Sequence, residues 1–140
     1  RTEIQSRQDI NMEEYAKIIH IEALTLIDML GKLIVPACAA YSKQLAEGVA
    51  AKAGIGVDAP AEAAQVRLLT EKTAELIERA ERLKAVVAAE PEELNARAMY
   101  EHEAVIPAME AARQVADELE GRVGKEYWPM PSYADLLFYV

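Results

Sequence analysis

Several residue types are scarce in this sequence, and each scarcity argues against a class of structure or function. The chain has 140 residues but a single cysteine, Cys38, which leaves no pair for an internal disulfide and fits a reducing compartment. Basic residues are outnumbered, with 15 Lys and Arg against 24 Asp and Glu and a formal net charge of -9. Nucleic acids and anionic membranes both call for clustered basic residues. We therefore expect a cytoplasmic protein that binds neither.

Residue types that carry catalysis or bind metals are also few. The two histidines, His20 and His102, lack a carboxylate or second histidine three or four residues away, the spacing that aims two ligands at one metal. We therefore expect a metal at neither histidine, and an inert buried thiol at Cys38. The best candidate for a buried functional carboxylate is Glu22 or Asp28 within the most apolar segment, although a paired structural role is favoured over catalysis.

What the sequence has in plenty is Ala, Leu, Glu, Lys and Arg, a composition typical of helices. It predicts one all-α domain, an antiparallel bundle of three to four long helices, two of them kinked at proline, over residues 1–126. An aromatic, proline-containing tail follows over residues 127–140. The chain begins with Arg rather than Met, so we expect it to be part of a longer protein.

The first helix is predicted to open at Asn11, because Glu14 follows it at capping-box spacing. From residue 18 to 41 apolar side chains cover nearly the whole helix circumference, which predicts a helix enclosed by its neighbours. A membrane span is the competing interpretation, but charged residues, Gly31 and Pro36 interrupt the segment. Because the helical pattern continues beyond Pro36, a kink is favoured there over a stop.

Residues 48–60, with their glycines, are predicted to form the main loop, and Asp58 with Pro60 to open the second helix. That helix carries a heptad seam, which fits a hairpin within the domain better than an intermolecular coiled coil. Pro91 is expected in the first turn of the third helix, which Gly121 and Gly124 close. The seam consists of Val66, Leu69, Thr73, Leu76, Ala80, Leu83 and Val87. The face that the third helix is predicted to bury consists of Leu94, Ala98, Met99, Val105, Met109, Ala112, Ala116 and Leu119.

A proline lies inside the first and the third helical patterns, in two similar sequence segments: LIVPACAA around Pro36 and AVIPAMEA around Pro107. Two kinked helices that bow around a common centre would explain this similarity, and so would a weak internal repeat. The sequence leaves both explanations open.

The tail is the unusual feature, because five of the eight aromatic residues lie in the last fourteen positions. Pro129 and Pro131 favour an extended chain there. Left in water, the aromatic and aliphatic side chains of the tail would form an adhesive patch, so we expect the tail to dock on its own bundle or on a partner. The docking residues are predicted to be Tyr127, Trp128, Pro129, Pro131, Tyr133, Leu136, Leu137 and Phe138.

The tail residues stand in the pattern W-x-x-P-x-Y-x-x-L-L-F, which resembles the C-terminus of type III glutamine synthetases. Two further words, IEALTLIDMLGKLIVPA at 21–37 and VIPAMEAARQVADELE at 105–120, resemble the C-terminal region of the same family. The resemblance covers nearly the whole chain, and its least specific part is the glycine-containing stretch near 48–60.

The resemblance implies a parent enzyme that joins ammonia to glutamate with ATP and Mg²⁺ or Mn²⁺, and that assembles as stacked rings in the cytoplasm. The catalytic strands and motifs of that enzyme are absent here, so no catalytic, cofactor-binding or metal residue is carried over, and this chain alone is expected to be inactive. It is then a non-catalytic assembly or regulatory domain, whose partners are the catalytic domain and neighbouring subunits of a homo-oligomer. The alternative is a free-standing helical bundle that binds a small molecule or protein partner, with His20, Glu22 or His102 lining the pocket.

Overall fold

The computed structural model describes the backbone of residues 2–131 and the side-chain exposure of residues 4–131. Within that range every regular element is helical, so the predicted all-α class is confirmed. The elements are α1 (Thr2–Met29), η1 (Leu30–Ile34), α2 (Val35–Gly54), α3 (Pro60–Ala88), α4 (Leu94–Tyr100), η2 (Glu101–Val105) and α5 (Ile106–Glu120).

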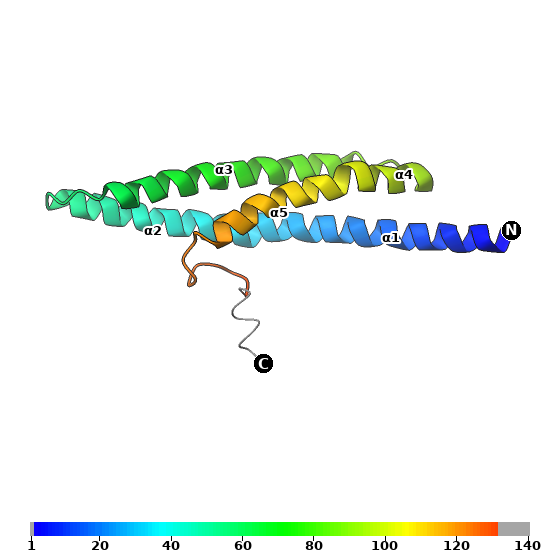
Figure 1. Ribbon diagram of the computed structural model, residues 1–140, viewed down its shortest axis with the longest axis horizontal. Coiled ribbons are helices and arrows are strands. Elements are labelled where there is room, and N and C mark those ends of the chain that lie inside the picture. The colour runs from blue at the N-terminus through cyan, green and yellow to red at the C-terminus, as the bar shows by residue number, and fades with distance from the viewer. Residues whose placement is uncertain (1, 132–140) are drawn as a thin grey trace.

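These elements form three rods that lie side by side in an elongated molecule (Figure 1). The first rod is α1, η1 and α2 in one continuous run, the second is α3, and the third is α4, η2 and α5. The chain reverses between α2 and α3 and again between α3 and α4, so successive rods are antiparallel. The third rod packs against α3 along α5 and against the N-terminal part of the molecule along α4.

The two elements η1 and η2 are five-residue π-helical segments, each followed by a proline. The N–H of Val35 donates to the carbonyl of Leu30, and the N–H of Ile106 donates to the carbonyl of Glu101, both across five residues instead of four. Pro36 and Pro107 are the second residues of the α-helices that follow. Since a proline cannot donate the usual backbone hydrogen bond, a wider π turn just before it accommodates the missing bond, and the helix continues as the sequence predicted for Pro36.

The core runs along the line where the three rods meet. The predicted seam of α3 is buried at Leu69, Leu76, Ala80, Leu83 and Val87, and partly buried at Val66 and Thr73. Its regular spacing places one side of α3 against both neighbouring rods. The first rod contributes Ile19, Ala23, Leu26, Leu30, Ile34 and Cys38, and the third contributes Val105, Ala108, Met109, Ala112, Val115, Ala116 and Leu119.

Several predicted boundaries are wrong. Asn11 does not begin the first helix, because α1 already starts at Thr2. The predicted loop at 48–60 is helical as far as Gly54, where α2 ends, and only residues 55–59 connect it to α3. Ala59, not Asp58, is the N-cap of α3, and Pro60 follows it at the first helical position. Alanine-rich sequence packed against α3 outweighs the weak local preference of the glycines.

Two predictions about the third rod also need correction. Pro91 lies in the turn before α4 and not in its first turn; Glu93 is the N-cap, and its side chain accepts hydrogen bonds from the backbone N–H groups of Asn95 and Ala96. Met99 is 63% exposed, not buried. It lies one residue before Tyr100, whose hydroxyl donates to the carbonyl of Val86 at 2.6 Å and thereby turns that side of α4 toward α3.

A search of the described residues finds no helix that combines the length and the apolar character needed to cross a membrane.

Candidate functional site

The first candidate site is the outer face of α1, which we define as Ile10, Ile18, Ile21 and Leu24. At 100° per residue these side chains fall within one third of the helix circumference, opposite Ala23, Leu30 and the other core residues of that helix. Their exposed fractions are 57%, 52%, 60% and 47%. The predicted enclosure of this helix by its neighbours is therefore wrong for this face, because α3, α4 and α5 all lie on the other side of α1 (Figure 1).

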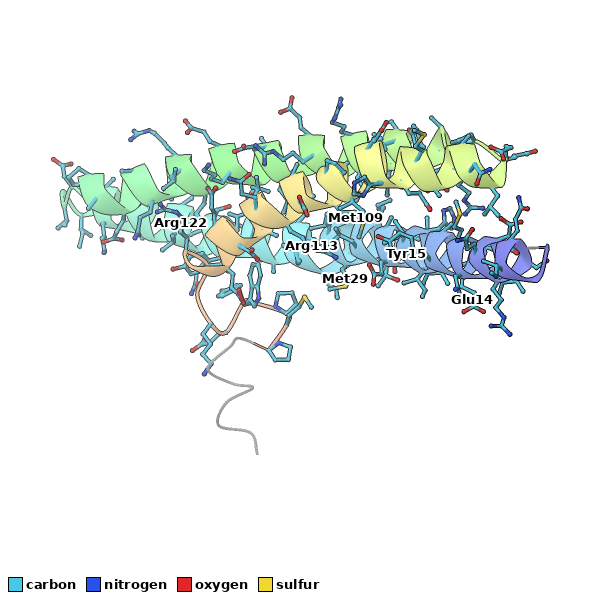
Figure 2. The ribbon with its side chains drawn as sticks, turned by 45° about the vertical axis from the view of Figure 1, so that its right-hand side comes forward. Glu14, Tyr15, Met29, Met109, Arg113 and Arg122 are labelled. Atoms are coloured by element: carbon cyan, nitrogen blue, oxygen red, sulfur yellow. The ribbon has the colours of Figure 1, made fainter. Side chains whose placement is uncertain are left out.

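The outer face of α1 lies along the edge of the molecule that the other rods leave uncovered. Side chains project from that edge into open space in Figure 2, with Glu14 among them. Four large aliphatic side chains grouped on one exposed side of a helix are unusual for a surface in contact with water. Exposed Glu14 and Lys17 lie in the same third of the helix, so the face combines apolar and charged side chains, as protein interfaces commonly do.

The second candidate site is the start of the tail, where residues after α5 fold back on the first rod. The rings of Tyr127 and Tyr41 have centroids 5.4 Å apart and are tilted by 57°, a geometry that aromatic pairs favour. Trp128 and Met130 are partly buried and also pack against the core. Gly124 permits this approach, because a Cβ at that position would lie 2.8 Å from Cε1 of Tyr41.

The third candidate site is a partly buried charged cluster between α1 and the third rod, formed by His20, Glu90, Arg97 and Glu101. Nδ1 of His20 lies 3.0 Å from Oε2 of Glu90. Nη2 of Arg97 lies 3.5 Å from the same Glu90 oxygen, and its Nε lies 3.9 Å from Oε2 of Glu101. The cluster thus joins α1, the turn after α3, α4 and the first residue of η2.

Glu101 is the deepest member of this cluster, with 0% of its surface exposed. The pKa of its carboxyl is raised to about 7, chiefly by burial and also by the interaction with the neighbouring Glu90 carboxylate, while the charge of Arg97 lowers it. The protonated carboxyl can donate to Glu90. In the described geometry neither oxygen of Glu101 has a hydrogen-bond partner among the described residues.

This cluster also holds the group of side chains best placed to bind a metal. One ligand atom each from His20, Glu90 and Glu101 lies within 4.8 Å of the other two. The sequence predicted no metal at either histidine because it offered no partner on the same helix. The partners of His20 come instead from segments seventy or more residues further along the chain.

The other charged candidates from the sequence lie elsewhere. Glu22 and His102 are on the surface, so the structure does not bring them together with His20 around a pocket. Asp28 is 62% exposed on its side chain and pairs with Lys32 at 2.8 Å. The prediction of a bundle-centre carboxylate at Glu22 or Asp28 is therefore wrong.

Cys38 is placed as the sequence predicted, fully buried in the core. Burial is the main cause that raises the pKa of its thiol, to about 11. A thiol of this kind is almost entirely protonated at neutral pH, and the protonated form is a poor nucleophile.

Of the predicted docking residues, Tyr127 and Trp128 pack against the core, while Pro129 and Pro131 are exposed. Tyr133, Leu136, Leu137 and Phe138 lie outside the described residues.

One signal in the sequence points to Glu101. When the segments around Pro36 and Pro107 are aligned on their prolines, Glu101 falls opposite Leu30, three residues before each similar segment, so a carboxylate stands where the first rod has a buried leucine. A charge at an expected core position requires a partner, and this signal could have marked the cluster before the structure did.

Comparisons with known proteins agree with the resemblance. Residues 1–53 match the family model of the glutamine synthetase C-terminal domain. The chain is 33% identical over 145 aligned positions to a type-3 glutamine synthetase of Dictyostelium discoideum, an alignment that covers 97% of this chain. It is also 31% identical to a glutamine synthetase of Butyrivibrio fibrisolvens, with 99% of this chain covered. In both cases the chain spans 20% of the relative's length.

Proposed function

Because the chain belongs to the C-terminal domain family of type III glutamine synthetases, we propose that it is a non-catalytic assembly or regulatory domain of such an enzyme. The parent enzyme would ligate ammonia to glutamate with ATP and Mg²⁺ or Mn²⁺. The domain would contact the catalytic domain and neighbouring subunits of a homo-oligomer.

The observation that carries this proposal is the outer face of α1. It lies within residues 1–53, the segment that matches the family model, and its aliphatic side chains are about half exposed or more. Removing apolar area from water stabilises an interface by about 25 cal/mol per Å². Since the chain spans 20% of each relative's length, the parent enzyme has ample further surface to cover this face.

The charge of the molecule is compatible with the same assignment. The chain carries a formal net charge of -9, so two copies repel each other wherever their surfaces are acidic. The outer face of α1 groups four exposed aliphatic side chains with charged neighbours such as Glu14 and Lys17. An apolar centre with a polar rim is the usual anatomy of a specific protein interface.

To test this assignment, Ile21→Glu would be compared with Ile77→Glu, an isoleucine on α3 that is 44% exposed where Ile21 is 60% exposed. In the 140-residue chain both variants should unfold within about 0.5 kcal/mol of the unsubstituted protein, because both sites face water. In the full-length enzyme, Ile21→Glu should dissociate the oligomer or lower glutamine formation at least tenfold, because it buries a charge at the contact. Light scattering and an ATP-dependent glutamine assay measure these effects.

A full-length Ile21→Glu enzyme with unchanged assembly and activity would refute the proposed role of the outer face of α1. Equal damage from Ile77→Glu would show that the effect is not specific to α1.

We further propose that the tail is anchored by Trp128 and Phe138 and clasps the catalytic part or a neighbouring subunit. The partial burial of Trp128 on the core supports a fixed start for the tail. Trp128→Ala should lower the free energy of unfolding of the 140-residue chain by about 2 kcal/mol, less than the loss for a fully buried Trp. Thermal and urea unfolding give this value, and Met99→Ala, at an exposed site on α4, is the control. A full-length Trp128→Ala enzyme with unchanged stability and oligomeric state would contradict the anchor.

The finer shape expected from the sequence is also part of the proposal. We propose that each π segment and its proline bend a rod, so that the first and third rods bow around the shared core. Both π segments lie beside the core, with Leu30 and Val105 fully buried. Such a bend would set the direction in which the outer face of α1 is presented to its partner.

A further inference from the structure

We propose that His20, Glu90 and Glu101 form a binding site for a divalent transition-metal ion, with Zn²⁺ as the ion that fits best. The three ligand atoms already lie within 4.8 Å of one another, and no ion is needed to bring the three segments together. This site is separate from the outer face of α1 and does not depend on the proposed assembly role.

The strongest argument for a missing cation is Glu101. Its carboxylate is completely buried, and neither oxygen has a hydrogen-bond partner among the described residues. One oxygen of Glu90, whose side chain is 7% exposed, is also without a partner there. Buried carboxylates without donors are rare, because the lost hydration is not replaced. A divalent ion would replace it for both side chains at once.

The chemistry of the donors indicates the class of ion. One imidazole nitrogen with two carboxylates is a mixed nitrogen and oxygen set, which suits Zn²⁺ and related ions better than Mg²⁺ or Ca²⁺, since those prefer oxygen alone. Two ligands on a tetrahedral Zn²⁺ with bonds of about 2.0–2.1 Å lie about 3.3 Å apart. The 3.0 Å between His20 Nδ1 and Glu90 Oε2 is the length of an ordinary hydrogen bond, and a small separation of the two atoms would make room for the ion.

Arg97 is the competing cation. Its contacts with Glu90 and Glu101, at 3.5 and 3.9 Å, are longer than ordinary hydrogen bonds, and its Nε has no hydrogen-bond partner among the described residues. The arginine therefore balances the charge of the cluster without satisfying its oxygens. Its side chain is 29% exposed, so it can move toward solvent when a metal ion takes its place.

The structure provides room for that movement. A pocket of about 270 Å³ lies beside the cluster, with Arg97 in its wall. Two acidic residues, Glu13 and Glu92, and one basic residue, Lys17, also line this pocket, so with Arg97 its charged side chains balance. The His20 side chain is 34% exposed, so the cluster is open to solvent on the α1 side.

A bound ion would hold α1, the turn between α3 and α4, and η2 together. These segments are linked in the described structure chiefly by weak ion pairs and by packing. Because the folded protein presents the three ligands together and the unfolded chain does not, binding would raise the unfolding temperature in proportion to ion concentration.

The test uses tag-free 140-residue protein, stripped with a chelator, and titrates it calorimetrically with Zn²⁺, Mn²⁺ and Mg²⁺. We expect one saturable Zn²⁺ site, weaker binding of Mn²⁺, and no detectable binding of Mg²⁺. Glu101→Gln should weaken Zn²⁺ binding at least tenfold. Glu103→Gln, at an exposed neighbour on the same π segment, should leave it unchanged.

The histidines offer a second matched pair. His20→Ala should abolish the site, whereas His102→Ala should have little effect, because His102 is exposed and its side chain is not in the group of three ligands, although it follows Glu101 directly. Circular dichroism of each variant confirms that it is folded. Should one ligand variant fail to fold, the other still decides the question.

Arg97→Met separates a metal site from a purely structural ion-pair network. Removing the competing cation should tighten Zn²⁺ binding severalfold, and added Zn²⁺ should restore the unfolding temperature that the substitution lowers. An ion-pair network without metal affinity would lose stability and recover none of it. No saturable Zn²⁺ binding, or binding that survives both Glu101→Gln and His20→Ala, would overturn the proposal.

Discussion

The first and third rods both contain a π-helical segment followed by a proline, but their side chains at matching positions differ. In each, a five-residue π segment ends two residues before a proline, at Pro36 in one rod and Pro107 in the other. The first residues of the two segments, Leu30 and Glu101, are both 0% exposed. The backbone and the depth are equal, and only the chemistry of the side chain differs.

The two rods also differ in side-chain chemistry one helical turn before these residues. Leu26 and Leu30 are a buried apolar pair in the first rod, and the matching positions in the third rod hold Arg97 and Glu101. The apolar pair is stabilised by packing alone. The charged pair needs further partners and still leaves carboxylate oxygens without donors.

This comparison shows that the charged cluster is not required by the backbone. Leucines fill the same positions in the first rod, and apolar replacements of buried ion pairs are often neutral or stabilising. The third rod therefore keeps a buried carboxylate that packing does not demand, which is the pattern expected where a side chain serves binding instead of stability.

The largest expected effect is at the apolar segment. Leu30→Ala should lower the free energy of unfolding by about 2–5 kcal/mol, because it leaves a cavity at a fully buried site. Glu101→Leu, at the matching position, should cost nothing or raise stability, because Arg97, Glu90 and His20 can still pair with one another. Urea unfolding of both variants in the presence of a chelator measures the contrast. Equal losses at the two positions would mean that Glu101 is as structural as Leu30.

The next effect is a pH dependence confined to the charged segment. The folded-state pKa of Glu101 is raised from 4.5 to about 7, so its protonated form favours folding. Its stabilising contribution is complete below pH 4.5 and is lost as pH rises to about 7. At roughly 1.4 kcal/mol per pKa unit, the loss is on the order of 3 kcal/mol.

Glu101→Gln removes this titration, so the stability difference between this variant and the unsubstituted protein should grow from pH 4.5 to 7. The charged or titratable groups that face Glu101 are His20, Glu90 and Arg97, and all three are kept in both proteins. Chelator-treated samples unfolded by urea across this range give the curve. A constant difference, or an equal one in Glu103→Gln, would show that the carboxyl of Glu101 is not the group that titrates.

The parts of this fold that the sequence predicted are those set by local periodicity. The seam of α3 repeats every three to four residues, and the buried residues Leu69, Leu76 and Leu83 follow it. The mistaken helix start at Asn11 followed a capping pattern that occurs by chance inside a longer helix. The enclosed first helix was mistaken for a different reason: the apolar pattern of a helix does not tell whether each apolar face is covered within the domain.

The charged cluster could not be predicted from residue spacing along a single helix. Its members are brought together by the pairing of rods, and no spacing within one helix links His20 to Glu90 or Glu101. Only the match between Glu101 and Leu30, each three residues before a similar segment, carried information about it. The similarity between the two segments was visible in the sequence, but it could identify the cluster only once both positions were known to be buried.

The smallest expected effect concerns the second position of each π segment, Gly31 and His102. A Cβ at Gly31 would meet nothing within 4 Å, and the exposed His102 shows that the matching position accepts a side chain. Gly31→Ala should therefore raise the free energy of unfolding by about 0.5–1 kcal/mol, because alanine loses less backbone entropy on folding. Gly124→Ala is the opposite control, since its Cβ would lie 2.8 Å from Tyr41 and should destabilise the start of the tail. A loss of stability in Gly31→Ala, measured as a lower urea midpoint, would show that the first π segment requires glycine and that the two segments are less alike than their backbones.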